Sequence, residues 1–425
     1  MVDKIFTFPE KAAEVRRNYQ RLNLETNPFP IQGLASRGTP FVPYPKKVIQ
    51  TINTFVTDAI GSKGYHGLPI VGDYGSGKTR LLFAIEKEIV EGIVGCNAAY
   101  IDEPPADIQL FYEKVLDKAD LESILKGLSL RFGKDIESIM SNHLERVPSL
   151  LREEKYFLKG NGIGLVEEIS SFLSKELGFT QAKDVTRAYA ILLLDYFVSN
   201  IVNAGKRMRI SLVNSVVSEK SSARQYISGN RVSKDLGQAM NFTDKKIKKM
   251  DICGEVFKLF VNINKIAGNS FLFILIDEFE EIIEKKTNRQ ILDFLNDFRS
   301  LINNNVTSDF AIILSCTPEA WIKATQLSPG FGERFVESAE MPPLDLESAQ
   351  KIAAAYLYSK RIKKTSKEDI APFEKEAIKH ILKASDYKIR EFIKNSNIVL
   401  TSLASSEESI IGVDFVDKAL KPPHY

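Results

Sequence analysis

The chain has 425 residues with 44% hydrophobic and 26% charged content, which is typical of a globular protein of two or three domains rather than of a disordered chain. Its apolar runs are shorter than the roughly 20 residues that a membrane-spanning helix needs, and its first residues do not form a signal peptide. Three separated cysteines and four scattered histidines indicate neither a disulfide framework nor a zinc site, and a net charge of +2 excludes neither nucleic acid nor protein as a partner. We therefore expect a cytoplasmic protein that has no membrane partner.

The first motif along the chain is a complete GxxxxGK[ST] pattern at 72–79, between an apolar stretch at 68–71 and a helical pattern at 81–91. This strand–loop–helix order is the context in which such a loop binds phosphate. Its glycines let backbone amides point at phosphate oxygens, and the next helix adds its positive N-terminal end. We expect Lys78 to reach the β- and γ-phosphates of ATP in catalysis, and Thr79 to offer its hydroxyl to Mg²⁺. The residues predicted to bind the nucleotide here are Gly72, Asp73, Tyr74, Gly75, Ser76, Gly77, Lys78, Thr79 and Arg80. The alternative is a glycine-rich turn without a ligand.

A long and mostly helical stretch, 107–251, separates this loop from the next motif. Helical patterns at 165–177 and 182–204 are its clearest elements, and the second is apolar enough to be buried within the fold or against another subunit. The segment 205–250 holds eleven Lys or Arg residues against three acidic ones, a net charge of +8. These basic side chains could follow the phosphate backbone of DNA, or they could form the solvated face of inserted helices. Both interpretations stay open.

The second motif is an unbroken apolar run at 271–276, which predicts a buried parallel strand and ends in Asp277 and Glu278. Carboxylates at the C-terminal end of such a strand lie where open α/β sheets bind ligands. We expect Asp277 to hold Mg²⁺, directly or through water, and Glu278 to polarise the attacking water. The alternative is that both acids only begin the charged helix that Glu280 and Glu281 continue.

A third buried strand, predicted at 310–314, is followed by two hydroxyl side chains, Ser315 and Thr317. One of them is expected to lie close to the γ-phosphate. We assign Thr317 to this catalytic role and keep Ser315 as the alternative, because the period-two pattern of a strand does not decide between them. Thr317 could equally cap the helix that begins near Pro318.

The order of these elements resembles the AAA+ ATPases, in the branch of the replication-origin initiators, the ExeA-type secretion ATPases and the transposition ATPases. The resemblance covers roughly 27–115 and 250–420. It implies an α/β fold with a P-loop NTPase core, in which helices cover both faces of a parallel sheet, together with a large helical insertion and a C-terminal helical lid. The implied parts are an N-terminal lead-in with an adenine-side helix at 1–60, the core at 61–106 and 252–343, the insertion at 107–251 and the lid at 344–425.

Two arginines take their roles from this resemblance. The segment 332–335, GERF, is similar to the one that carries an arginine finger, so Arg334 is expected to reach the γ-phosphate of a neighbouring subunit in a homo-oligomer. Arg390 is similar to the lid arginine that touches the nucleotide in its own subunit, although the family's usual glycine before it is missing.

The stretches at 223–230, 275–282 and 341–344 also look like those of ATP-binding proteins found with BREX phage-defence clusters and of their archaeal relatives. Together the expectations describe an ATPase that uses ATP and Mg²⁺ and whose assembly is coupled to DNA or to a protein effector, in a defence, transposition or replication-like role. The alternative is a nucleotide-gated scaffold that recruits proteins through its helical insertion with little hydrolysis. A P-loop kinase is disfavoured by the lid and the two arginines.

Overall fold

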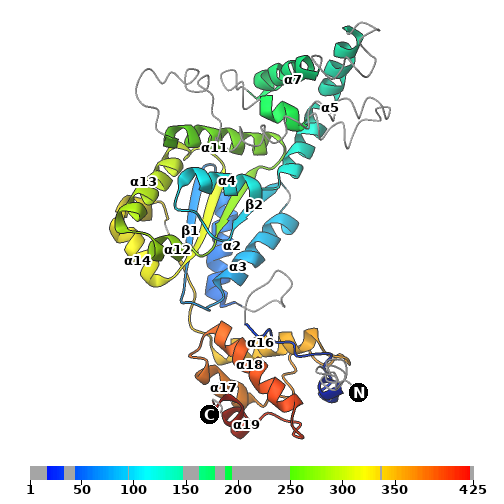
Figure 1. Ribbon diagram of the computed structural model, residues 1–425, viewed down its shortest axis with the longest axis vertical. Helices are drawn as coiled ribbons and strands as arrows, with labels where there is room; N and C mark the ends of the chain where they lie inside the picture. The colour runs from blue at the N-terminus through cyan, green and yellow to red at the C-terminus, as the bar shows by residue number, and fades with distance from the viewer. Residues whose placement is uncertain are drawn as a thin grey trace, which may run out of the picture.

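A five-stranded, all-parallel sheet forms the centre of the computed structural model, with the strand order β2-β3-β4-β1-β5 (Figure 1). The structure describes residues 17–32, 44–93, 95–146, 162–177, 187–193, 249–335 and 337–421. The strands are β1 (Tyr65–Val71), β2 (Cys96–Ile101), β3 (Phe271–Ile276), β4 (Phe310–Cys316) and β5 (Ala339–Glu340).

The central strands are buried on both faces, which explains why their sequences are continuous apolar runs rather than alternating ones. Side chains such as Phe273 and Ile313 pack into the core on one face of the sheet, with α2 (Lys46–Gly61), α3 (Lys78–Lys87) and the π-helical turn η1 (Glu88–Gly92). Their neighbours Ile274 and Ile312 pack on the other face. That face is covered by α4 (Ile108–Lys118), α11 (Lys249–Ile266), α12 (Glu280–Lys285), α13 (Asn288–Asn304), α14 (Pro318–Leu327) and α15 (Pro329–Gly332). The predicted α/β core, a parallel sheet between two layers of helices, is confirmed.

The register of the sheet brings the C-terminal ends of four strands to one edge. Ile276 of β3 pairs with Ile101 of β2 and with Leu314 of β4, while Val71 of β1 pairs with Cys316 of β4. The residues that follow these strands therefore lie beside one another, although they are far apart in the sequence. This edge faces the C-terminal domain, which lies below the sheet in Figure 1.

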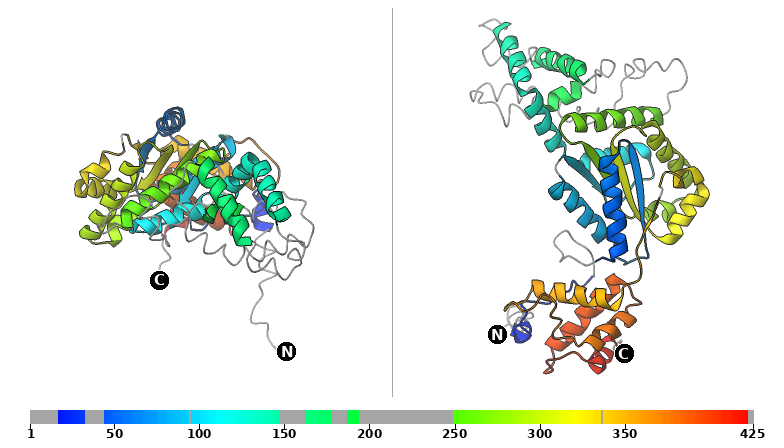
Figure 2. Two further views of the ribbon diagram at one scale, coloured as in Figure 1. Left: turned by 90° about the horizontal axis from the view of Figure 1, so that it is seen from above. Right: turned by 180° about the vertical axis from the view of Figure 1, so that it is seen from behind.

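The stretch predicted as a helical insertion consists mostly of helices in the part that the structure describes. After α4, the helices α5 (Leu121–Arg146) and α7 (Gly162–Glu176) pack against each other and project from the sheet on the side opposite to the C-terminal domain (Figures 1 and 2). The predicted helix at 165–177 matches α7, and the described part of the one at 182–204 is a helix with a buried 188–193 run. Helix α4 packs on β2, and α11 packs on β3, α4 and α13. The domain limits at 107 and 251 stay a prediction.

The predicted C-terminal helices form a domain with a hydrophobic core of its own. Its helices are α16 (Leu346–Ser359), α17 (Lys375–Ala384), α18 (Ile389–Ala404) and α19 (Val413–Leu420). The described N-terminal segment 17–32 joins this core, where the ring of Phe29 stacks on Tyr356 at 5.3 Å and meets Phe373 edge-on at 6.0 Å. The stretch predicted as one lead-in, 1–60, is thus divided, because this segment packs on the C-terminal domain and α2 packs on the sheet.

Candidate functional site

The loop between β1 and α3 depends on its glycines. Gly75 has a φ of +79° and Gly77 a φ of +97°, backbone conformations that side chains with a Cβ rarely adopt. A Cβ added to Gly72 would lie 2.6 Å from Cβ of Met341. Helix α3 begins at Lys78, and its N-cap residue, Gly77, gives no side-chain cap, so the first amides of the helix are available to an anion. The predicted strand–loop–helix geometry is present.

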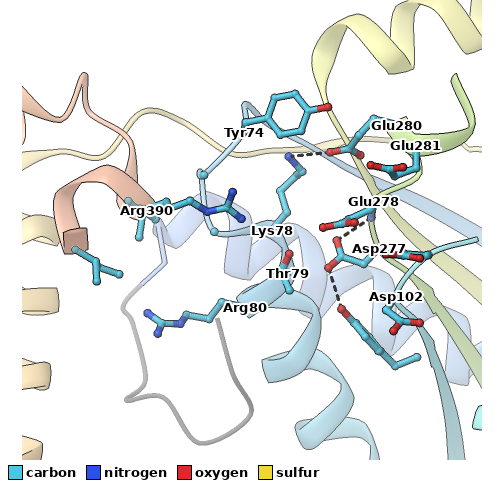
Figure 3. Close-up of a pocket in the computed structure, with 16 residues that line it drawn as sticks. Tyr74, Lys78, Thr79, Arg80, Asp102, Asp277, Glu278, Glu280, Glu281 and Arg390 are labelled. Atoms are coloured by element: carbon cyan, nitrogen blue, oxygen red, sulfur yellow. Dashed lines mark hydrogen bonds and ion pairs between the residues drawn. The ribbon is translucent and has the colours of Figure 1, made fainter. Parts of the chain in front are cut away.

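Lys78 is folded back along this loop and is only 7% exposed. Its Nζ donates hydrogen bonds to the carbonyl oxygens of Gly72 at 2.6 Å and Asp73 at 3.2 Å. The same Nζ lies 3.8 Å from Oε1 of Glu280 on α12 and 5.7 Å from the centre of the Tyr74 ring (Figure 3). The ammonium group is therefore held at the mouth of the loop, where phosphate oxygens would be bound.

Asp277 lies directly after β3, is 2% exposed, and accepts three hydrogen bonds. The Tyr100 hydroxyl of β2 donates to Oδ2 at 2.9 Å, and the amide of Glu278 donates to Oδ1 at 3.0 Å. The hydroxyl of Ser315, in β4, also donates to Oδ1. Three neighbouring segments thus fix one carboxylate at the edge of the sheet. The carboxylate in turn raises the pKa of Tyr100, in addition to the larger effect of burial.

Glu278 stands on a strained backbone, with a φ of +53° that is uncommon for a residue other than glycine, asparagine or aspartate. Its side chain is exposed and lines the same cavity as Lys78. Partial burial of its carboxyl group against the cavity wall raises the pKa of Glu278, and the charge of Asp277 raises it further. Strained residues of this kind cluster at functional sites, which supports the sequence-based choice of this acid.

The cavity has a volume of about 370 Å³ and lies between the sheet edge and the C-terminal domain (Figure 3). Arg390, Ile389 and Ile393 of α18 line it from the C-terminal domain, and the amide of Arg390 donates to the carbonyl oxygen of Gly75 at 3.1 Å. The residues that line it from the core are Tyr74, Gly75, Gly77, Lys78, Thr79, Arg80, Tyr100, Asp102, Glu103, Asp277, Glu278, Glu280 and Glu281.

Arg80 is a buried cation on the wall of this cavity, at 8% exposure. Its Nη2 donates to the Tyr356 hydroxyl of α16, and its guanidinium carbon lies 5.4 Å from the centre of that ring. Its Nε and Nη1 have no hydrogen-bond partner among the described residues. A buried guanidinium with unused donors is suited to an anion.

Four sequence-based choices, in addition to Arg334, lie away from the cavity lining. Gly72, Asp73 and Ser76 belong to the loop but are not among the lining residues. Thr317 caps α14 by accepting a hydrogen bond from the Ala320 amide at 3.3 Å, whereas its alternative, Ser315, is the residue that contacts Asp277.

Arg334 lies far from this cavity. Its backbone oxygen would be 2.6 Å from a Cβ added to Gly67, in the middle of β1, and its Nε donates to Asn303 at 2.8 Å. It is therefore beside the strand rather than at the end where the loop begins. Of the two arginines whose roles came from the family resemblance, the structure brings only Arg390 to the loop and the acids.

Sequence reasoning missed Tyr100 and the role of Glu280 as a buried lining residue. Tyr100 is an aromatic residue in an apolar strand, and only the pairing of β2 with β3 shows that its hydroxyl meets Asp277. Glu280 looks like an ordinary charged residue in the first turn of a helix, yet it is 3% exposed.

The loop glycines, Lys78 and Arg80 suit the phosphates of a nucleotide. Thr79 and Asp277 add the oxygen ligands that Mg²⁺ prefers.

Comparisons with known proteins give little information about the function of this site. No protein-family model matches the chain, and no curated protein matches it. Among solved structures, the chain is similar to the Aeropyrum pernix ORC2 protein in its ADPNP–ADP complexes, with 10% identity over 90% of this chain and 69% of that one and a TM-score of 0.41. A likeness of this strength carries no argument about function, and the resemblance to BREX-associated proteins finds no support here. Within the described ranges, the helices are too short or too polar to span a membrane.

Proposed function

We propose that this chain binds ATP with Mg²⁺ and hydrolyses it, as an AAA+-type ATPase. The observation that carries the proposal is the convergence of two distant segments on one cavity, the loop that ends in Lys78 and Thr79 and the acidic pair Asp277 and Glu278. The loop supplies donors for phosphate, and the acids supply a ligand for a hard cation and a base for water. Arg390 from the C-terminal domain adds a cation on the opposite wall.

Each side chain has a role that follows from its position. Lys78 and the first amides of α3 bind the terminal phosphates, while Arg80 from the core and Arg390 from the C-terminal domain bind phosphate oxygens. The loop residues Asp73, Tyr74 and Ser76 contribute their backbone. Thr79 and Asp277 hold Mg²⁺, which neutralises charge on the phosphates when bound. Glu278 orients the attacking water and accepts its proton.

Ser315 takes a positioning role in this proposal. Its hydrogen bond fixes Asp277, while the hydroxyl of Thr317, chosen from the sequence for the γ-phosphate, is used as a helix cap. Ser315→Ala should therefore lower turnover. Thr317→Ala should mainly lower the melting temperature, by an amount that reflects the roughly 0.5–2 kcal/mol of a lost cap. A larger loss of turnover in Thr317→Ala than in Ser315→Ala would restore the sequence-based assignment.

The proposal includes assembly of several copies, because Arg334 lies beside β1 and away from its own cavity. In a head-to-tail homo-oligomer it would face the cavity of the next subunit and stabilise the charge of the transferring phosphate there. The rate of hydrolysis would then depend on contact between subunits. This role rests on the resemblance of 332–335 to an arginine-finger segment.

The proposed partners are DNA, through the basic segment 205–250, and a protein effector. Residues 205–248 lie outside the described residues, so the charge of the sequence carries the DNA proposal. Six or more phosphate contacts would lower the affinity for DNA by on the order of 10³-fold between about 50 and 200 mM salt. A cytoplasmic location and a defence, transposition or replication-like role belong to the same proposal.

The decisive experiment is ATP turnover measured against protein concentration, with and without duplex and single-stranded DNA. We expect specific activity to rise with protein concentration, and DNA to stimulate it. Lys78→Ala should abolish binding of MgATP, and Glu278→Gln should bind MgATP without turning it over. A folded wild-type protein that binds no MgATP would overturn the proposal, while stable binding without turnover would leave a nucleotide-gated scaffold.

A further inference from the structure

Glu280 is a buried carboxylate beside the cavity that the proposed chemistry does not use. It lies in the first turn of α12, is 3% exposed, and lines the cavity beside Lys78. Its Oε1 is 3.8 Å from Nζ of Lys78, and its Oε2 has no hydrogen-bond partner among the described residues. Figure 3 shows the two side chains pointing toward each other from α12 and α3.

This arrangement does not benefit stability. A buried carboxylate with one oxygen unpaired costs free energy, and an ion pair at 3.8 Å without a direct hydrogen bond offsets only part of that cost. Burial raises the pKa of Glu280 even though the charge of Lys78 opposes the shift. A side chain that is kept in place at such a cost is a candidate for a role in function.

The charges involved define that role. Lys78 is the cation expected to bind the β- and γ-phosphates, and Glu280 is the nearest carboxylate that the structure gives it. A nucleotide phosphate bound to Lys78 would be attracted to the ammonium group and repelled by the carboxylate on its other side. Glu280 and phosphate therefore compete for one cation.

Neighbouring acids on the same helix do not share this geometry. Glu281 also lines the cavity, but its carboxylate is paired with Lys285, one turn along α12. Glu284 accepts a hydrogen bond from the Tyr74 hydroxyl at 2.8 Å. The helix thus offers an internal comparison, because Glu280 and Glu281 carry the same charge at the same cavity and differ in their contact with Lys78.

We propose that Glu280 is a positioning residue for Lys78 that weakens nucleotide binding and speeds nucleotide release, an inference that rests on the proposed ATP site. By drawing the ammonium group toward α12, it lowers the share of the Lys78 charge available to phosphate. The effect applies to any nucleotide with a β-phosphate, including the product ADP, and does not apply to adenosine.

The test compares Glu280→Gln with the matched control Glu281→Gln. Binding of MgADP and of adenosine to each protein is measured by titration calorimetry, and MgADP dissociation by stopped-flow fluorescence of a labelled analogue. We expect Glu280→Gln to bind MgADP about tenfold more tightly, because dissociation becomes slower. A tenfold change in affinity corresponds to one charge interaction in a partly solvated site. Adenosine affinity should be unchanged. Glu281→Gln should stay within about twofold of wild type, since its carboxylate is paired with the exposed Lys285 and such a pair near the surface contributes little.

Other outcomes overturn the proposal. Equal tightening in both variants would show general repulsion by an acidic cavity, and unchanged MgADP affinity in a folded Glu280→Gln protein would show a purely structural carboxylate. Should Glu280→Gln fail to fold, Glu280→Asp keeps the charge and retracts it from Lys78, and it must also bind MgADP more tightly. If wild type binds no MgADP or MgATP, the proposed function itself fails; if wild type binds both and the variants match it, only the role of Glu280 fails.

Discussion

Arg334 provides the sharpest test of subunit contact, because its distance from its own cavity follows from strand geometry. The backbone of Arg334 lies beside Gly67 in β1. The phosphate loop begins at Gly72, five residues after Gly67 and directly after β1 ends. At about 3.3 Å per residue this is roughly 16 Å, well beyond the reach of one arginine side chain. Arg334→Ala should therefore keep MgATP binding and lose about 10³-fold or more of turnover.

A mixing experiment separates action in the same subunit from action on a neighbour. Arg334→Ala keeps a nucleotide site and lacks the finger, while Lys78→Ala lacks the site and keeps the finger. When equal amounts of the two variants form head-to-tail assemblies, half of the cavities are intact and half of these face a neighbour that keeps Arg334. About a quarter of all cavities would then combine an intact site with an intact arginine finger. We expect the mixture to recover about that fraction of wild-type turnover, measured by phosphate release at a protein concentration where wild type is assembled.

Three results would refute the reasoning. Turnover of the mixture equal to the sum of the separate variants, with assembly confirmed by light scattering, would exclude action across subunits. Unchanged turnover in Arg334→Ala alone would remove the finger assignment. Loss of MgATP binding in that variant would instead place the arginine in its own site, against the distance estimated from the strand.

Three further predictions concern the cavity itself. Gly75→Ala must adopt a φ of +79° with a Cβ, so MgATP affinity should fall about tenfold, whereas Gly61→Ala, where a Cβ meets nothing within 4 Å, should leave it unchanged in the same calorimetric titration. Tyr100→Phe removes one of the three hydrogen bonds to the carboxylate that follows β3, and turnover at saturating MgATP should fall tenfold or more, in line with about 1.5–3 kcal/mol for a bond to a charged group. Tyr65→Phe is the control, since that buried hydroxyl has no hydrogen-bond partner among the described residues; an equal loss in both variants would contradict the assignment. Burial raises the pKa of Glu280 above its ordinary value of 4.5, so the folded state keeps this proton to higher pH than the unfolded chain, and the free energy of unfolding should fall as pH rises through that interval. Melting curves across about pH 4–8 should show this fall in wild type and a smaller one in Glu280→Gln; parallel curves would contradict it.

The sequence predicted the parts of the site that a local pattern specifies. The loop glycines must allow positive φ, the lysine must begin a helix, and a buried parallel strand must be continuously apolar, so 72–79 and 271–278 could be recognised without a structure. The parallel sheet between two helical layers and the C-terminal helical domain were implied by the resemblance to the AAA+ ATPases.

Contacts between distant segments were beyond that reasoning. The hydroxyl of Tyr100 meets Asp277 because β2 pairs with β3 in one particular register, and no local pattern specifies this. The strand pattern also left Ser315 and Thr317 equivalent, and the neighbours of each decided which one contacts the acid. The packing of the N-terminal segment 17–32 on the C-terminal domain depends in the same way on distant contacts, those of Phe29 with Tyr356 and Phe373.

A hydrogen bond between main-chain atoms links the C-terminal domain to the phosphate loop. The amide of Arg390, in the first turn of α18, donates to the carbonyl oxygen of Gly75. Backbone N–H groups in the first turn of a helix have no partner within the helix, so this hydrogen bond needs no side chain. Substituting Arg390 changes the charge that the domain presents without removing this hydrogen bond. A mutant series at position 390 would therefore compare side chains at the cavity wall while this main-chain hydrogen bond is retained.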